Sequence, residues 1–130
     1  MKIIDTKTHG ILDYLVGGLL IVSPWLFNFY NEGAESWVPI VLGIGTLAYS
    51  MMTNYEMGLL KAMSMKAHLA MDFVGGAILA VSPWLFGFAD LVFWPHLIFG
   101  VFEIMASLIT ETLPRENTSG KSAPYLKDKH

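Results

Sequence analysis

The 130-residue sequence contains no cysteine and few charged residues. Without cysteine, the chain can form neither a disulfide nor a thiolate metal site. Only 15% of its residues are charged, whereas a soluble domain usually carries about 25%. Its net charge is −3 and it has no basic groove interleaved with aromatic residues, which argues against nucleic acid as a partner. Neither a glycine-rich phosphate loop nor a nucleophile elbow is present, and we expect the protein not to be an enzyme.

Long apolar stretches dominate the sequence instead. Hydrophobic residues make up 54% of the chain, and its mean hydropathy is +0.51. A helix that crosses a bilayer needs roughly 17–25 mainly apolar residues. The stretches also lack the polar stripe that a helix of a soluble protein presents to water. The sequence therefore predicts an all-α bundle of four transmembrane helices, at about residues 8–27, 37–54, 66–87 and 91–111.

The two halves of the chain resemble each other. When residues 8–29 are aligned with residues 67–88, 11 of 22 positions are identical, and both segments contain the string VSPWLF. We interpret the chain as two repeats of two helices each, at 1–57 and 58–112, followed by a polar tail at 113–130 that we expect to be disordered. Because each repeat holds an even number of spans, the repeats are parallel hairpins, related by a pseudo-two-fold axis along the membrane normal.

Charges outside the apolar stretches predict the orientation. All eight Lys and Arg residues lie before the first predicted helix, between the second and third, or after the fourth. The other two connections carry only the acidic residues Glu32, Glu35 and Asp90. Since Lys and Arg in short loops mark the cytoplasmic face, we predict a multi-pass protein of the cell membrane with both termini in the cytoplasm.

A Ser-Pro-Trp triplet stands near the end of the first helix of each repeat. The residues are Ser23, Pro24 and Trp25, and Ser82, Pro83 and Trp84. Proline has no backbone N–H and interrupts a helix, while the serine hydroxyl can cap a new short turn or bond back into the old one. Tryptophan prefers the depth of the lipid headgroups. We interpret the triplet as a device that ends or bends the helix and anchors it at the outer surface. The alternative is a substrate gate built from two kinked helices.

These triplets, each preceded by a His-x3-Asp pattern and followed by an aromatic cluster, resemble the SPW repeat family of small integral membrane proteins. The resemblance covers about residues 8–112. It implies a four-helix membrane protein and supplies no activity.

Each repeat carries a His and an Asp four residues apart near the start of its first helix, namely His9 with Asp13 and His68 with Asp72. Residues at this spacing share a helix face, and pseudo-symmetry can bring all four to the central axis. Each His can pair structurally with its own Asp or a neighbouring helix end, the group can relay protons, or it can bind a divalent metal such as Zn²⁺. We expect no cofactor, with a divalent metal as the alternative.

Glu103 is a further candidate, because it lies nine residues after Trp94 and therefore about 13 Å into the membrane. We expect it either to take part in transport or to form hydrogen bonds with polar residues of the second and fourth helices, which are Thr46, Tyr49, Ser50 and Ser107. Glycines let membrane helices approach closely. We expect the odd-numbered helices to cross near the glycines inside the membrane helices, among them Gly17 and Gly76, and the alternative is that these glycines mark a surface between copies of the chain.

We predict a structural or interaction module whose partners are the lipid bilayer and either a second copy or another membrane protein. The alternative is a minimal proton, ion or small-solute transporter or channel component. Its candidate residues are His9, Asp13, His68, Asp72 and Glu103. The sequence names no substrate and no oligomeric state.

Overall fold

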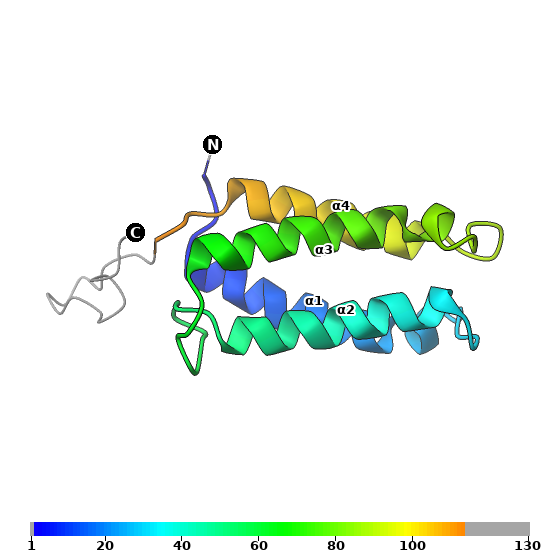
Figure 1. Cartoon of the computed structure of the whole chain (residues 1–130), viewed down its shortest axis with the longest axis horizontal. Coiled ribbons are helices and arrows are strands. Elements are labelled where there is room, and N and C mark those ends of the chain that lie inside the picture. Colours follow the sequence, from blue (N-terminus) through cyan, green and yellow to red (C-terminus); the bar gives the residue numbers. More distant parts are fainter. Residues whose placement is uncertain (1, 114–130) are drawn as a thin grey trace, which may run out of the picture.

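The computed structural model describes residues 2–113, and these residues form four helices and no sheet. The helices are α1 (Thr6–Leu26), α2 (Ala34–Met51), α3 (Met65–Leu85) and α4 (Trp94–Ile109). α1 packs chiefly against α2 and α3 against α4, so two helical hairpins lie side by side (Figure 1). The predicted all-α class is confirmed. Of the tail at 113–130 that we expected to be disordered, residues 114–130 lie outside the described residues.

Helix ends differ from the predicted ones by at most three residues. α2 begins at Ala34 rather than at residue 37. The polar residues here, which favoured a loop in the sequence, form hydrogen bonds with the backbone that precedes the helix. The Glu35 carboxylate accepts from the Gly33 N–H at 3.3 Å, and the Ser36 hydroxyl accepts from the Asn31 N–H at 2.9 Å. α4 begins at Trp94 rather than at residue 91, with a proline in its first turn, where the missing N–H leaves no hydrogen bond unmade.

Polarity in the bundle is the reverse of that in a soluble protein. Large apolar side chains are exposed on all four helices, for example Leu15, Val41, Ile78 and Met105. The buried positions, by contrast, include many polar side chains, among them His9, Asp13, Thr46, Ser50, His68, Asp72, Glu103 and Ser107. α1 and α3, each of 21 residues, are long and apolar enough to cross a membrane. An apolar exterior around a hydrogen-bonded polar interior suits lipid as the surrounding solvent.

Glycines bring helices together within each hairpin rather than between the odd-numbered helices. A Cβ placed on Gly43 of α2 would lie 2.6 Å from the carbonyl oxygen of Gly17 in α1. A Cβ on Gly100 of α4 would lie 2.6 Å from the carbonyl oxygen of Gly76 in α3. The expected crossing of α1 and α3 at these glycines is therefore wrong, because the small residues face the hairpin partner and permit its backbone to approach.

Candidate functional site

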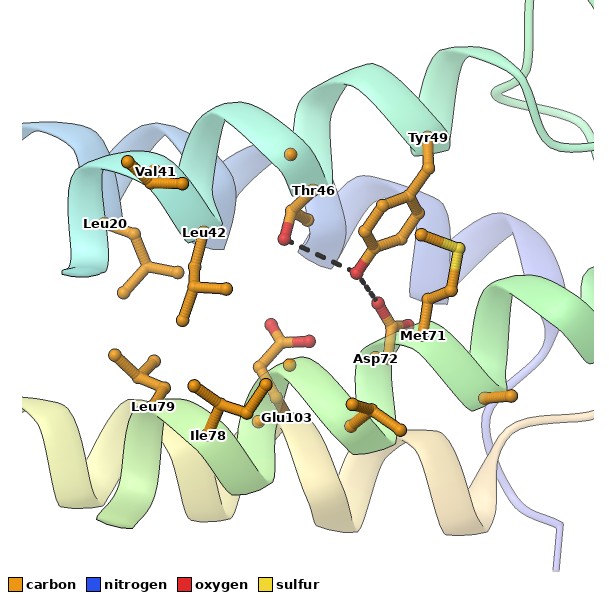
Figure 2. Close-up of a pocket in the computed structure, with 15 residues that line it drawn as sticks. Leu20, Val41, Leu42, Thr46, Tyr49, Met71, Asp72, Ile78, Leu79 and Glu103 are labelled. Carbon is orange, nitrogen blue, oxygen red and sulfur yellow. Dashed lines mark hydrogen bonds between the residues drawn. The ribbon is translucent and has the colours of Figure 1, made fainter. Parts of the chain in front are cut away.

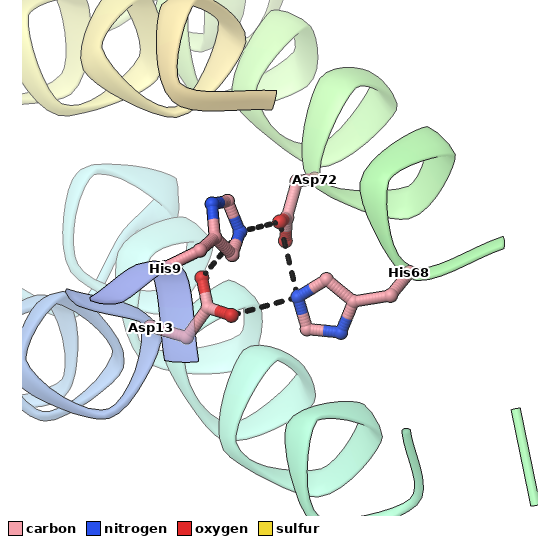
Figure 3. A group of neighbouring side chains, drawn as sticks. All are labelled: His9, Asp13, His68 and Asp72. Atoms are coloured by element: carbon pink, nitrogen blue, oxygen red, sulfur yellow. Dashed lines mark hydrogen bonds and ion pairs between the residues drawn. The ribbon is translucent and has the colours of Figure 1, made fainter. Parts of the chain in front are cut away.

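Four side chains converge near the end of the bundle at which α1 and α3 begin (Figure 3). His9 and Asp13 come from α1, and His68 and Asp72 come from α3. Each of the four is at most 2% exposed. One ligand atom from each residue can be chosen so that all lie within 4.8 Å of one another. The two pairs that the repeat placed at matching positions therefore form one buried group.

Each imidazole Nε2 faces one carboxylate of its own helix and one of the other hairpin. His9 Nε2 lies 2.7 Å from Asp72 Oδ2 and 3.1 Å from Asp13 Oδ1. His68 Nε2 lies 2.7 Å from Asp13 Oδ2 and 3.1 Å from Asp72 Oδ2. The shorter contact of each histidine crosses between hairpins, and the longer one is the four-residue pair that the sequence indicated. We call this closed arrangement the His–Asp ring.

Threonine hydroxyls fix the tautomer of both histidines. The Thr110 hydroxyl donates to the Ala106 carbonyl at 2.5 Å, so its oxygen must accept from His9 Nδ1–H, which lies 2.8 Å away. The Thr53 hydroxyl likewise donates to a carbonyl of α2 at 2.6 Å and accepts from His68 Nδ1–H at 2.7 Å. Both Nδ1 atoms therefore carry a proton, and both Nε2 atoms face the carboxylates.

Tyrosines complete the surroundings of the two carboxylates. The Tyr49 hydroxyl of α2 donates to Asp72 Oδ1, and the Tyr55 hydroxyl donates to Asp13 Oδ2 at 3.4 Å. Tyr55 lies in the connection between α2 and α3 and is fully buried. Burial, together with the nearby Asp13 charge, raises the pKa of the Tyr55 hydroxyl, so it remains a hydrogen-bond donor.

The backbone around the His–Asp ring joins the start of each hairpin to the end of the other. The Ile4 N–H donates to the Ile109 carbonyl at 3.0 Å, after which α1 begins. The Met63 N–H donates to the Met52 carbonyl at 2.7 Å, just before α3 begins. These two contacts hold the first turns of α1 and α3, and therefore the histidines, in place.

A cavity of about 490 Å³ lies between α2 and α3 and reaches the His–Asp ring. Apart from Asp72, its polar lining comes from Thr46, Tyr49 and Glu103, and the rest of its wall is mostly apolar. Figure 2 shows the Glu103 carboxylate pointing into this cavity, and it shows the Tyr49 hydroxyl between Thr46 and Asp72. Glu103 is 6% exposed, so the structure places it in the interior but outside the His–Asp ring.

None of the four hydrogen bonds considered for Glu103 is formed within the described residues: Thr46 contacts the Tyr49 hydroxyl, and the Ser50 hydroxyl does not reach Glu103. Tyr49 donates to Asp72 instead, and the Ser107 hydroxyl donates to the Ile104 carbonyl at 2.7 Å. Serine in a helix bonds readily to a carbonyl of its preceding turn, which removes it from the set of available partners.

The Ser-Pro-Trp triplets end α1 and α3 at the opposite end of the bundle. Pro24 has no N–H to donate to the Leu20 carbonyl, and the Ser23 hydroxyl donates to it instead at 2.8 Å. The Ser82 hydroxyl donates to the Leu79 carbonyl at 2.7 Å in the same way. We considered that the serine either caps a new short turn or bonds to the preceding turn of its own helix. The structure shows the second of these. The serine therefore replaces the hydrogen bond that the proline removes.

The proline carbonyl then helps to end the helix. The Phe29 N–H donates to the Pro24 carbonyl at 2.8 Å, across Asn28, which has a φ of 58°. In the second repeat the same bond is 2.7 Å long and Gly87, with a φ of 76°, takes the left-handed position. This is the Schellman ending of a helix, in which Asn and Gly tolerate a positive φ. Trp25 and Trp84 are more than half exposed on the outside of these ends.

The family model of the SPW repeat domain matches residues 7–110. The chain belongs to the SPW repeat family. The resemblance seen in the sequence is thus confirmed, and no curated protein or solved structure matches the chain significantly. The part that matches the SPW repeat domain includes both triplets and the whole His–Asp ring with its two threonines.

Sequence reasoning missed the supporting residues of the His–Asp ring. Thr53 and Thr110 stand at matching positions of the two repeats, so the alignment did carry a signal for them. No such signal existed for Tyr49 and Tyr55, whose counterparts in the second repeat are not tyrosines.

Proposed function

We propose that this SPW repeat protein crosses the cell membrane four times and serves there as a structural or interaction module. The single observation that carries the proposal is the closed state of the His–Asp ring. Every side-chain nitrogen and oxygen of its four residues contacts a partner within the chain. In a medium without water, such a network stabilises the contact between the two hairpins, because no competing hydrogen-bond partners are available.

Equivalent contacts support the proposed parallel hairpins. The contact of His9 with Thr110 corresponds to that of His68 with Thr53, because the histidines stand 59 residues apart and the threonines 57, which are the offsets between the first and the second helices of the repeats. The backbone bond of Ile4 to Ile109 corresponds in the same way to that of Met63 to Met52. Contacts repeated at constant offsets are expected of hairpins related by a pseudo-two-fold axis along the membrane normal. α2 and α4, of 18 and 16 residues, would be the shorter spans, with a length of about 24–27 Å.

The basic residues support termini in the cytoplasm. Lys2, Lys7, Lys61 and Lys66 lie around the start of α1 and the connection from α2 to α3, which occupy the same end of the bundle (Figure 1). The charged residues of the connections at the other end are all acidic. Single cysteines test this in a chain that has none. Leu91→Cys should react in intact cells with a membrane-impermeant maleimide, whereas Leu59→Cys, 74% exposed at the proposed inner end, should react only after lysis.

A module without transport activity should not raise the proton permeability of lipid vesicles. Proteoliposomes that contain a pH-sensitive dye should show, under an imposed potential, the same proton flux as empty vesicles. Self-association in the same vesicles is measured by energy transfer between labelled copies at increasing dilution in lipid. Flux well above the empty-vesicle background would contradict the proposal.

The cavity favours one second candidate, a minimal proton, ion or small-solute pathway. Its support is that Glu103 and Asp72 both line the cavity, whose wall is mostly apolar, and buried acids in membrane helices often line pathways. This candidate predicts flux that is lost in Glu103→Gln and retained in Ser107→Ala, since the Ser107 hydroxyl bonds to its own helix.

A further inference from the structure

Donor atoms of two kinds alternate around the His–Asp ring. Going round, each Nε2 lies between two carboxylate oxygens, at contacts of 2.7 and 3.1 Å on each histidine. Around a tetrahedral zinc ion, ligand atoms bound at 2.0–2.1 Å stand ~3.3 Å apart. To admit such an ion, the contacts around the ring would have to lengthen by a few tenths of an ångström, and ligand atoms across the ring, which lie within 4.8 Å of one another, would have to approach to about the same distance. Side-chain rotations can make both adjustments.

The two threonines hold the imidazoles as metal ligands are usually held. A metal-bound histidine almost always donates its other ring N–H to a fixed acceptor, which sets its tautomer and orientation. Thr110 and Thr53 accept from Nδ1–H of His9 and His68 at 2.8 and 2.7 Å. Each threonine is fixed in turn by donating to a backbone carbonyl.

Charge in the ring also matches a divalent cation. Two carboxylates carry two negative charges, and two imidazoles protonated at Nδ1 alone are neutral. One divalent ion would balance the ring and would take the place of the two Nε2 protons that balance it in the hydrogen-bonded form. Buried charges are otherwise costly unless they are paired or bound to a metal.

One carboxylate of the ring faces a cavity. Asp72 lines the cavity between α2 and α3. The Tyr49 hydroxyl, which donates to Asp72, stands at the same wall (Figure 2). A cation that entered here would meet a carboxylate before it met either histidine.

We propose that His9, Asp13, His68 and Asp72 together bind one divalent transition-metal ion. Two nitrogen and two oxygen donors are a set that zinc binds in tetrahedral coordination, and Co²⁺ serves as its spectroscopic substitute. With no position left for water, the site is structural, and the metal would tie the two hairpins together.

The test uses the full chain in detergent after treatment with a chelator. Titration with Zn²⁺ should show one ion bound per chain, and Co²⁺ should give the intense visible bands of tetrahedral coordination. Thr53→Val, which leaves all four ligands in place, should weaken Zn²⁺ binding by about 10–100-fold. His96→Gln is the control, because His96 is equally buried but lies at the other end of α4.

His9→Gln should bind at least ~100-fold more weakly than the wild type, because it removes a ligand itself. If that variant does not fold, Thr53→Val and Thr110→Val still decide the matter, since valine keeps the shape of threonine. Absence of Zn²⁺ binding to the wild type overturns the proposal. So does equal binding by the wild type and both threonine variants, or a cobalt spectrum typical of six-fold coordination.

Discussion

Removal of the Ser23 hydroxyl should destabilise the protein only while the next residue is proline. The Ser23 hydroxyl is the donor that reaches the Leu20 carbonyl, at 2.8 Å, and Leu20 is 2% exposed. A buried carbonyl left without a donor costs ~1–3 kcal/mol, whereas hydrogen bonds between membrane helices average only ~0.6 kcal/mol. For Ser23→Ala we expect a loss of about 1–2 kcal/mol in the free energy of unfolding, because Pro24 supplies no replacement.

The substitution Pro24→Ala supplies a backbone donor that can replace the Ser23 hydroxyl. It restores an N–H at the position from which a helix normally bonds to the Leu20 carbonyl. By itself this change should cost ~1 kcal/mol in lost packing, since Pro24 is fully buried. The double variant Ser23→Ala, Pro24→Ala should lose little more than Pro24→Ala, which corresponds to a coupling energy of about 1–2 kcal/mol.

Unfolding in mixed detergent and dodecyl sulfate micelles, followed by far-UV circular dichroism, measures all four corners of this cycle. Ser82 and Pro83 form the same contacts in the second repeat, with a bond of 2.7 Å to the Leu79 carbonyl, and offer an independent replicate. If the double variant loses the sum of the two single losses in both repeats, the serine does not replace the missing backbone bond, and our explanation of the triplet fails.

Two further predictions concern the helix contacts and the His–Asp ring. Gly43→Ala should cost ~1–3 kcal/mol, because its Cβ would meet the backbone of α1, whereas Gly45→Ala, with nothing within 4 Å of its Cβ, should be neutral or slightly stabilising. Equal effects of the two in the same unfolding assay would contradict the close contact. Tyr49→Phe should cost ~1.5–3 kcal/mol, as expected for a hydrogen bond to a charged group, whereas Tyr55→Phe, whose bond is 3.4 Å long, should cost less than half as much. A larger loss in Tyr55→Phe would reverse our ranking of the two tyrosines.

The sequence alone could identify which residues gather, because a duplicated hairpin must place matching residues at matching sites. Recurrence of His-x3-Asp at an offset of 59 residues was sufficient to select His9, Asp13, His68 and Asp72. Spacing within one helix, however, reveals only a shared face. It indicated the 3.1 Å contacts inside each helix and could not indicate the 2.7 Å contacts between hairpins. Those depend on how the hairpins dock.

Packing contacts between helices were harder to predict for the same reason. A glycine marks a close approach but does not name the partner, so Gly17 was assigned to α3 although it faces Gly43 of α2. The sequence made Tyr49 and Ser107 candidate partners of Glu103, because all three are expected at a similar depth in the membrane. In the structure both hydroxyls donate to other acceptors. Competition between acceptors is decided by distances that only the folded chain defines.

The hairpins are held together unevenly along the bundle, and this decides what loss of the His–Asp ring should do. Within each hairpin, backbones touch at the glycine contacts, and these are independent of the ring. Between hairpins, the described contacts include the ring and several backbone bonds at one end, a small apolar cluster around Leu20 and Leu79, and at the other end one hydrogen bond of His96 to the Glu35 carbonyl with aromatic contacts of Phe27 and Phe29. In lipid, apolar contacts between helices gain little from exclusion of water, so the end with the ring, where most of the hydrogen bonds between hairpins lie, should contribute most of the attraction. Substitutions in the ring should therefore loosen the two hairpins from each other while each hairpin keeps its own fold.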